Sequence, residues 1–279
     1  MTWFLEVPLS IIMIHSLNPY GFSHLRRVNE DNIDINRNFL DHTKPHPNND
    51  GYVGLAEFVA PKIIDFWTRI FLWPQLIWYV VSGQTKVLQE AISGGQYSHP
   101  DGLFYGGKYE TWSNKTIQSI CHRYLDGKRR VIFLDFHTGL GKYGKYKIIL
   151  QHPEDSNLYK RSVEIWGEGN VITTYKGDEN SDGDGVALTG PMKLAIPIYL
   201  PQTEVTAVTV EFGTSSNIDV FVALREENWL HHHNDPSTQE GREIKERLLR
   251  IFYPADNNWR IDVWSAGEKV IHEAIEKGT

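Results

Sequence analysis

Two ionisable residues stand at the points where apolar strands should end. His137 follows the apolar run Val131–Leu134 in "VIFLDFHTG", and Glu211 closes the run in "EVTAVTVEFGT". In open α/β sheets, sites lie beyond the carboxyl ends of the strands, so both side chains could share one cleft. There the histidine could bind a metal or move protons, and the glutamate could act as a general base. The alternative is that both residues are structural, with the histidine hydrogen-bonded to a loop and the glutamate paired with an arginine. On spacing alone, this structural alternative is favoured.

A cluster of arginines and amides shifts the balance toward a site. The segment "RRVNEDNIDINRNF" brings together Arg26, Arg27 and Arg37, with Asn36 and Asn38 beside Arg37. A guanidinium fork can hold a carboxylate through two parallel hydrogen bonds, so the pattern predicts a carboxylate-binding pocket. The alternative is a solvated ion-pair network with the acidic residues of the same segment, which are Glu30, Asp31 and Asp34.

The elements that must position these residues follow from hydrophobic periodicity and breaker residues. Strands are predicted at 9–14, 131–136, 147–150 and 204–214. Helices are predicted at 57–82 with a break at Pro74, at 85–92, at 111–125 with Ser113 as N-cap, at 238–253 and at 259–277. Glycine-rich loops are predicted at 93–107, after residue 137 and across 175–190. This alternation predicts an α/β fold with a mixed, mostly parallel sheet flanked by helices.

Composition narrows the class of protein. The 279 residues carry a formal net charge of −7, which argues against a general nucleic-acid binder. Cys121 is the single cysteine, so no internal disulfide can form; this fits a reducing compartment and predicts a cytoplasmic location. The Trp-rich segment 70–81 is too short for a spanning helix, which predicts no transmembrane segment.

The ordered motifs resemble a known enzyme family. "NPYGF", "RRVNEDNIDINRNF", "LDFHTG" and "TVEFGT" follow one another as in the zinc carboxypeptidase superfamily of the carboxypeptidase A type. The nearer likeness is to a bacterial subgroup of unassigned function, which "GGQYSHPDGLFYGG", "HTGLGKYG" and "NWLHHH" also resemble. The resemblance runs from about Ile11 to the end and implies one carboxypeptidase-like domain over residues 1–279.

The resemblance also implies residue roles. His137 would be a zinc ligand, and Glu211 would be the base that activates water. Asn36 and Arg37 would bind the terminal carboxylate of the substrate, while Arg27, or its neighbour Arg26, would polarise the scissile carbonyl.

One departure from the family concerns the metal. The family takes two zinc ligands from a His-x-x-Glu motif before the Asn-Pro-x-Gly segment, but only 17 residues precede Asn18 and none of them forms that motif. Catalytic zinc needs about three protein ligands, so the zinc site is incomplete. Either the chain lacks the family's N-terminal elements, which we expect because the other site residues persist, or it is a degenerate member without metal. The family's substrate-contacting tyrosine is also not evident, and Tyr175 and Tyr199 are the possible replacements.

Four further features have plainer readings. Adjacent histidines point in different directions, so His231–His233 is expected to be a surface or hydrogen-bonded cluster. Asp178–Gly183 resembles half of a calcium loop but lacks the bidentate glutamate, so it is expected to be a flexible loop. His15 and Cys121 are both expected to be packed rather than functional.

Three functions compete at this point. The first is a metallocarboxypeptidase-like hydrolase that cleaves an amide next to a free carboxylate, in a peptide or an acylated amino acid, and is inactive as written if two zinc ligands are missing. The second is a metal-free protein that binds carboxylate ligands through Arg27, Asn36 and Arg37. The third is an interaction protein that uses the Trp-rich segment 67–79.

Overall fold

The computed structural model describes residues 9–175 and 186–278 and has the α/β architecture expected from the sequence. In the described chain, a four-stranded sheet has the order β1-β4-β2-β3. β1 with β4 and β2 with β3 pair in parallel, whereas β2 with β4 pairs antiparallel, so the sheet is mixed and mostly parallel. The strands are β1 Arg130–Tyr143, β2 Tyr146–Leu150, β3 Val171–Thr173 and β4 Glu204–Gly213.

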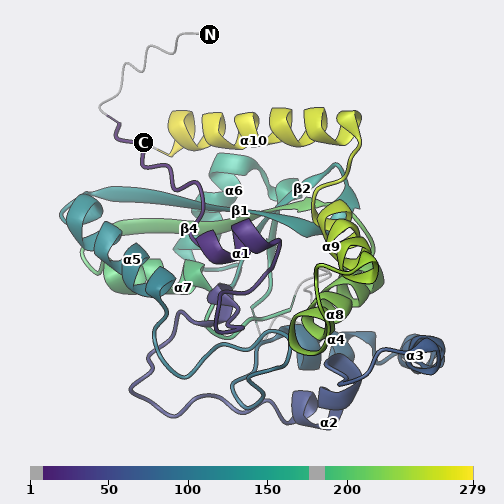
Figure 1. The fold of residues 1–279 in the computed structure, drawn as a ribbon. Coiled ribbons are helices and arrows are strands. Elements are labelled where there is room, and N and C mark those ends of the chain that lie inside the picture. The colour runs from purple at the N-terminus through teal and green to yellow at the C-terminus, as the bar shows by residue number, and fades with distance from the viewer. Residues whose placement is uncertain (1–8, 176–185, 279) are drawn as a thin grey trace.

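Helices cover both faces of this sheet (Figure 1). The apolar face of α6 and α10 packs on β2 and β4 around Trp166 and Val270, while α5 and α7 pack on β1 and β4 around Ile117 and Ile196. A third core lies beyond the sheet between α2, α3, α4 and α8. The helices are α1 Pro19–His24, α2 Asp50–Val59, α3 Phe66–Val81, α4 Thr85–Ser93, α5 Trp112–Ile120, α6 Asn157–Trp166, α7 Met192–Tyr199, α8 Asn217–His233, α9 Gln239–Phe252 and α10 Asn257–Lys277, with short turns η1 Ile35–Arg37, η2 Cys121–Leu125 and η3 Glu168–Asn170.

The predicted strand at 9–14 is wrong. These residues have no regular structure, and Ile11, Ile12, Met13 and Ile14 are exposed. An apolar run favours burial, but a strand also needs the edge of another strand to bond with, and the sequence pattern does not supply that partner.

Three boundaries also differ from the prediction. Pro74 lies inside α3 and does not end it, and β1 continues through the predicted loop to Tyr143. Thr111, not Ser113, caps α5, because its hydroxyl accepts a hydrogen bond from the Asn114 N–H at 3.2 Å. Ser113 lies inside the helix and donates to the Leu17 carbonyl instead.

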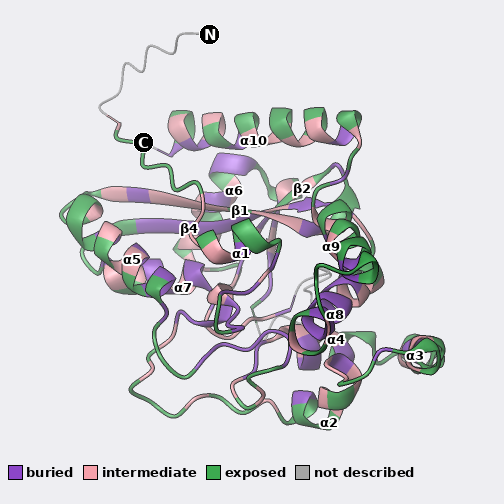
Figure 2. Ribbon diagram, viewed as in Figure 1, coloured by how far each residue is buried: buried purple, intermediate pink, exposed green. Residues whose placement is uncertain are grey.

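Helix α8 was not predicted because it lacks an amphipathic pattern. Its middle is buried on all sides and includes Arg225, Glu226 and Glu227 as well as Leu224 and Leu230 (Figure 2). A helix recognised by one apolar stripe is missed when charged residues are also buried. Helices α1, α6 and α7 and strand β3 were missed as well, and the helix predicted at 57–82 is two helices, the end of α2 and α3, separated by residues 60–65.

Helix α3 contrasts with α8. Its sixteen residues include one charge, Arg69, yet much of its surface is exposed (Figure 2). Leu72 and Leu76 are buried against the third core, whereas Trp67, Phe71, Trp73 and Trp78 point into solvent; they belong to the segment for which an interaction role was considered. No helix in the described part of the chain is long and apolar enough to span a bilayer.

Candidate functional site

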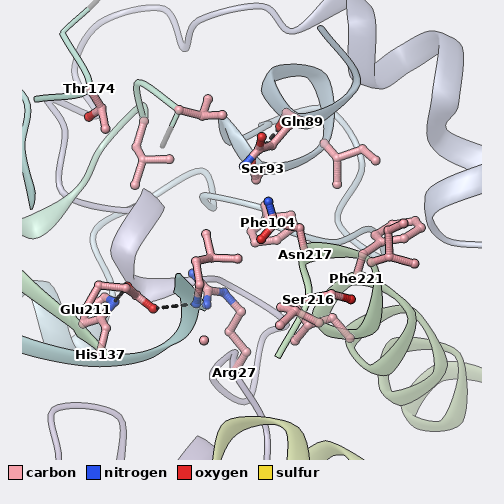
Figure 3. A pocket seen from close by; sticks show the side chains of 18 of the residues that line it. Arg27, Gln89, Ser93, Phe104, His137, Thr174, Glu211, Ser216, Asn217 and Phe221 are labelled. Carbon is pink, nitrogen blue, oxygen red and sulfur yellow. Dashed lines mark hydrogen bonds and ion pairs between the residues drawn. The ribbon is translucent and has the colours of Figure 1, made fainter. Parts of the chain in front are cut away.

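A cavity of about 470 Å³ lies against the carboxyl-terminal halves of β1 and β4. Helices α3, α4 and α8 and the loop that carries η1 complete its wall (Figure 3). Its volume lies within the range of small-molecule sites. Five of the six residues expected at a site line it, namely Arg27, Asn36, Arg37, His137 and Glu211.

His137 and Glu211 meet because β1 and β4 pair in parallel with these two residues in register. Side chains of registered residues on neighbouring strands point to the same face of a sheet. The Nδ1 atom of His137 is therefore 3.8 Å from Oε2 of Glu211. Oε1 of Glu211 accepts a hydrogen bond from the Leu140 N–H at 3.1 Å, which holds the carboxyl group toward the strand end.

Asp135 completes a row of three side chains. It precedes His137 by two residues on β1, so both side chains lie on the same face. Its Oδ2 atom is 2.7 Å from Nε2 of His137. This contact directs Nδ1 of His137 toward Glu211 and fixes the orientation of the ring. The sequence contained this signal, because Asp135 and His137 have the spacing of a strand pair, but Asp135 was not singled out.

In this row, the pKa values of both His137 and Glu211 are raised. Burial lowers the pKa of His137, but the charge of Asp135, its hydrogen bond and the charge of Glu211 outweigh burial and leave that pKa raised. Burial raises the pKa of Glu211 and outweighs the opposing charge of His137. A carboxyl group whose pKa is shifted toward neutrality is suited to accept and return a proton.

Arg27 presents an incompletely used guanidinium group to the cavity. Its Nε atom donates to Oδ2 of Asp34 at 2.9 Å, and the group lies over the ring of Phe104, 5.1 Å from the centroid. None of the described residues accepts a hydrogen bond from its two terminal nitrogens. Figure 3 shows Arg27 extending between the Glu211–His137 pair and helix α8.

Arg37 is more constrained than the sequence suggested. Its Nε and Nη2 atoms donate to the Ser93 carbonyl at 3.1 and 2.7 Å, and Nη1 donates to the Asn36 carbonyl at 2.8 Å. Burial lowers the pKa of Arg37 to about 10, although the charge of Asp34 opposes that shift. The group therefore contributes positive charge to the cavity while most of its fork is bound to the backbone.

Asn36 is oriented by the start of α7. Its side-chain oxygen accepts a hydrogen bond from the Met192 N–H at 2.8 Å, so the amide nitrogen remains as a donor at the cavity wall. Asp34 anchors the same turn, because its Oδ1 atom accepts from the Asn36 N–H. Burial raises the pKa of Asp34, but the charges of Arg27 and Arg37 outweigh it and hold that pKa below the usual value.

Lys193 is a cavity residue that was missed. It lies near the start of α7 and is 4% exposed, and its Nζ atom donates to the Ile149 carbonyl at 3.1 Å. Burial lowers its pKa to about 8, against the charges of Asp135 and Glu211. No motif marks this lysine, and its position at the site depends on α7 packing against β1 and β4.

Arg26 does not belong to the site. Its side chain is buried away from the cavity, with Nε 2.8 Å from Oε1 of Glu227 on α8 and Nη2 3.0 Å from Oδ1 of Asn32. Between the two adjacent arginines, only Arg27 is placed to touch a ligand in the cavity.

The two tyrosines considered as replacements also lie outside the cavity lining. The hydroxyl of Tyr199 donates to Oδ1 of Asn114 at 2.7 Å, and burial raises its pKa to about 12. Tyr175 is exposed, while its neighbour Thr174 lines the cavity.

The structure bears differently on the four features that were expected to have no role in the site. Cys121 is buried, as expected. His15 is exposed and contacts the ring of Phe22, so it is not packed. His231–His233 ends α8, where adjacent rings contact each other. The predicted loop at Asp178–Gly183 lies outside the described residues.

The side chains present do not fit a catalytic zinc ion. A carboxylate on the far nitrogen of a histidine, as Asp135 is on His137, is the usual support of a metal-binding histidine. Yet within residues 9–175 and 186–278 no group of three or more His, Cys, Asp or Glu side chains is arranged to hold a metal. Since catalytic zinc takes about three protein ligands, His137 alone is insufficient.

Comparison with known families gives one match. A family model described as "Protein of unknown function (DUF2817)" matches residues 5–266. The chain belongs to the DUF2817 family. Searches of curated proteins and of solved structures found no match. The family description names no activity, so a functional proposal for this DUF2817 member rests on the geometry of its cavity.

Proposed function

We propose that this protein is a hydrolase that cleaves an amide bond next to a free carboxylate, in a peptide or an acylated amino acid. The observation that carries the proposal is the registered pair of His137 and Glu211, which shares one cavity with Arg27, Asn36 and Arg37. The resemblance to zinc carboxypeptidases supports the same assignment of roles.

The positive side of the cavity would bind the carboxylate end of the substrate. The amide nitrogen of Asn36 and the two terminal nitrogens of Arg27 are donors available for a carboxylate or a carbonyl oxygen. The guanidinium group of Arg37, which is held by a backbone carbonyl, would add positive charge at a fixed position. Charge-assisted hydrogen bonds of this kind are about twice as strong as neutral ones.

Glu211 would act on the attacking water. It would accept a proton as the water oxygen bonds to the amide carbon, and Arg27 would stabilise the negative charge that develops on the carbonyl oxygen. Glu211 would then return the proton to the amide nitrogen as the carbon–nitrogen bond breaks. A water molecule is consumed, and one carboxylic acid and one amine are released.

A role for zinc in the proposed reaction is supported only by the sequence resemblance to zinc carboxypeptidases. His137 is its one family-implied ligand among the described residues. The reaction is therefore to be measured with and without added zinc.

A second candidate is a metal-free protein that binds carboxylate ligands. It is favoured by the lack of a three-ligand cluster in the described part of the chain. Under this function the arginines would bind the ligand as above, and Glu211 would have no catalytic task.

Turnover and binding, measured separately, distinguish the two functions. We expect amine release from N-acetyl amino acids by the wild-type protein, and a loss of at least about a hundredfold in kcat for Glu211→Gln with ligand affinity kept within a few-fold. The matched control is Glu204→Gln, at the opposite end of β4, which should keep both values.

Each other outcome is informative. Binding in calorimetry without turnover, with zinc and with a chelator, would support the carboxylate binder instead. Neither binding nor turnover would reject both functions.

A further inference from the structure

The cavity has an apolar arm that leads away from the His137–Glu211 pair. Helices α4 and α8 form its sides, with α3 at its far end. Its apolar lining includes Leu76, Leu88, Ile92, Ile218, Val220 and Phe221. In Figure 3, Phe221 lies on the side opposite Glu211 and His137, with Arg27 between them. One end of the cavity is therefore charged and the other is apolar.

The length of the arm follows from α4. Ser93, whose carbonyl binds Arg37, and Thr85 both line the cavity at opposite ends of this helix. Eight residues of α-helix span about 12 Å. An extended hydrocarbon chain of roughly ten carbons covers that length, because C–C bonds of about 1.5 Å advance it by about 1.3 Å each.

The cavity volume agrees with this length. A methylene group takes about as much space as a water molecule, roughly 30 Å³. A cavity of about 470 Å³ therefore holds a polar head and a chain of that length. One amino-acid side chain would leave much of it empty.

The far end of the arm is lined by residues of α3. Tyr79 and Val80 of α3 line the arm, and Val80 is 54% exposed. Elsewhere on its surface, α3 carries the exposed rings of Trp73 and Trp78.

The polar residues on the arm do not oppose an apolar occupant. Ser216 donates from its hydroxyl to Asp219 at 2.6 Å as part of the α8 cap. Asn217 and Thr85 lie at exposed ends of helices. The middle of the arm carries the buried apolar residues Leu88, Ile92 and Val220, with the side chain of Gln89 as its polar member.

We propose that the arm binds an unbranched hydrocarbon chain of about ten carbons, so that the ligand is an amphipathic carboxylate whose charged end lies at Arg27 and Asn36. This inference rests on the proposed function for the charged end and adds the class of substrate. The chain could be the acyl group of an acylated amino acid or the side chain of a long-chain amino acid, and both present the same chemistry to the arm.

Two ligand series test the proposal and separate those sources. One series is acetyl-, hexanoyl- and decanoylglycine; the other is N-acetyl-2-aminoalkanoic acids with side chains of one, five and nine carbons. Affinity is measured by calorimetry below the micelle concentration of each ligand. We expect about fourfold tighter binding per added methylene in one series until the arm is filled. Equal affinity along both series, or no binding of any member, would overturn the proposal.

Variants locate the chain. Ile218 is partly buried in the arm, and Ile218→Trp should shorten the chain length at which affinity levels off. The matched control is Ile198→Trp on exposed α7 surface, which should leave the series unchanged. Phe71→Ser alters exposed α3 surface outside the arm. If Phe71→Ser removes the chain-length dependence and Ile218→Trp does not, the chain lies on α3 and the proposal is wrong.

Failure of the proposed function would look different. Chain-length-dependent binding without hydrolysis of any ligand would reject the hydrolase and keep the arm as a chain-binding site. Hydrolysis that is indifferent to chain length would reject the arm and keep the hydrolase.

Discussion

Arg26 and Arg27 are adjacent in sequence and belong to two different charge clusters. Arg26 is 2% exposed at its side chain and is locked to Glu227, whose Oε1 atom also contacts Nζ of Lys245 at 2.6 Å. Arg27 is 28% exposed and uses one nitrogen on Asp34. We call the first group, Arg26, Glu227, Lys245 and Asn32, the closed cluster. The second group, Arg27, Asp34, Asn36, Arg37, Lys193, Asp135, His137 and Glu211, is the open cluster.

The two clusters show that charged residues are buried in two different kinds of environment in this molecule. In the closed cluster, the ion pairs tie the N-terminal loop to α8 and α9, and no member lines the cavity; Nη1 of Arg26, which has no hydrogen-bond partner in the described chain, is buried away from it. In the open cluster, several charged groups meet around a cavity, and donors on Arg27 and Asn36 are left without protein acceptors in the described chain. The first arrangement joins separate elements of the fold, whereas the second leaves charged groups facing the cavity.

The largest expected effect is on the stability of the closed cluster. Arg26→Met leaves the buried carboxylate of Glu227 with Lys245 as its remaining cation, so the free energy of unfolding should fall by about 3 kcal/mol. Arg27→Met is the comparison variant and should cost less, because Arg27 is partly exposed and the Asp34 carboxylate that it leaves keeps the charge of Arg37 and the N–H of Asn36. Urea unfolding of both variants measures this, and equal losses would erase the distinction between the clusters.

Lys193 tests whether the open cluster carries an energetic cost. The pKa of Lys193 is about 8 in the fold and about 10.4 when unfolded, so the unfolded chain binds more protons between these values. Its charge therefore destabilises the fold below pH 8, and this cost is relieved as pH rises to about 10.4. Wild-type stability should rise over this window by up to about 3 kcal/mol relative to Lys193→Met.

Urea unfolding at several pH values from 7 to 10.5 gives both stability curves. Parallel curves for wild type and Lys193→Met would show that burial of the charged lysine does not destabilise the fold. The open cluster would then carry no energetic cost and would not differ from the closed cluster in this respect.

Arg27 should matter for ligand binding more than for folding. Arg27→Met removes charged hydrogen bonds worth about 1.5–3 kcal/mol, so the affinity for an N-acetyl amino acid should fall by about tenfold to a hundredfold. Arg27→Lys should recover part of this loss, because the charge remains without the fork. Calorimetry on folded Arg26→Met, which should bind as wild type does, completes the comparison; a weaker affinity there would place Arg26 in the site.

The smallest effect concerns the proton held by His137. Asp135→Asn removes the charge and hydrogen bond that raise the pKa of His137 against burial, so that pKa should fall. Histidine proton resonances followed by NMR against pH measure it, with Asp219→Asn, on exposed α8 surface, as the control. An unchanged titration of His137 would remove Asp135 from the open cluster.

Much of the site could be anticipated, for reasons specific to each residue. His137 and Glu211 were visible because each follows an apolar β-type run, and the end of a parallel strand is a recurring location for ligands. Arg27, Asn36 and Arg37 were visible from residue chemistry within one loop. Asp135 carried a usable signal in its spacing from His137, whereas Lys193 carried none.

The strand at 9–14 and helix α8 show the limits of pattern. An apolar run indicates burial but not a partner, and residues 9–14 have no place in the described sheet. Helix α8 buries Arg225, Glu226 and Glu227, so its sequence lacks the stripe by which helices are recognised.

The sequence by itself determined the α/β class, the two strands that carry His137 and Glu211, and the residue types available for carboxylate chemistry, because these depend on local periodicity and side-chain chemistry. Tertiary structure alone decided that β1 and β4 align His137 with Glu211, that Arg27 rather than Arg26 faces the cavity, and that an apolar arm extends from the charged end. These features depend on strand register and helix packing between segments far apart in the chain. Such contacts are set by which surfaces bury each other, and no local pattern encodes that choice.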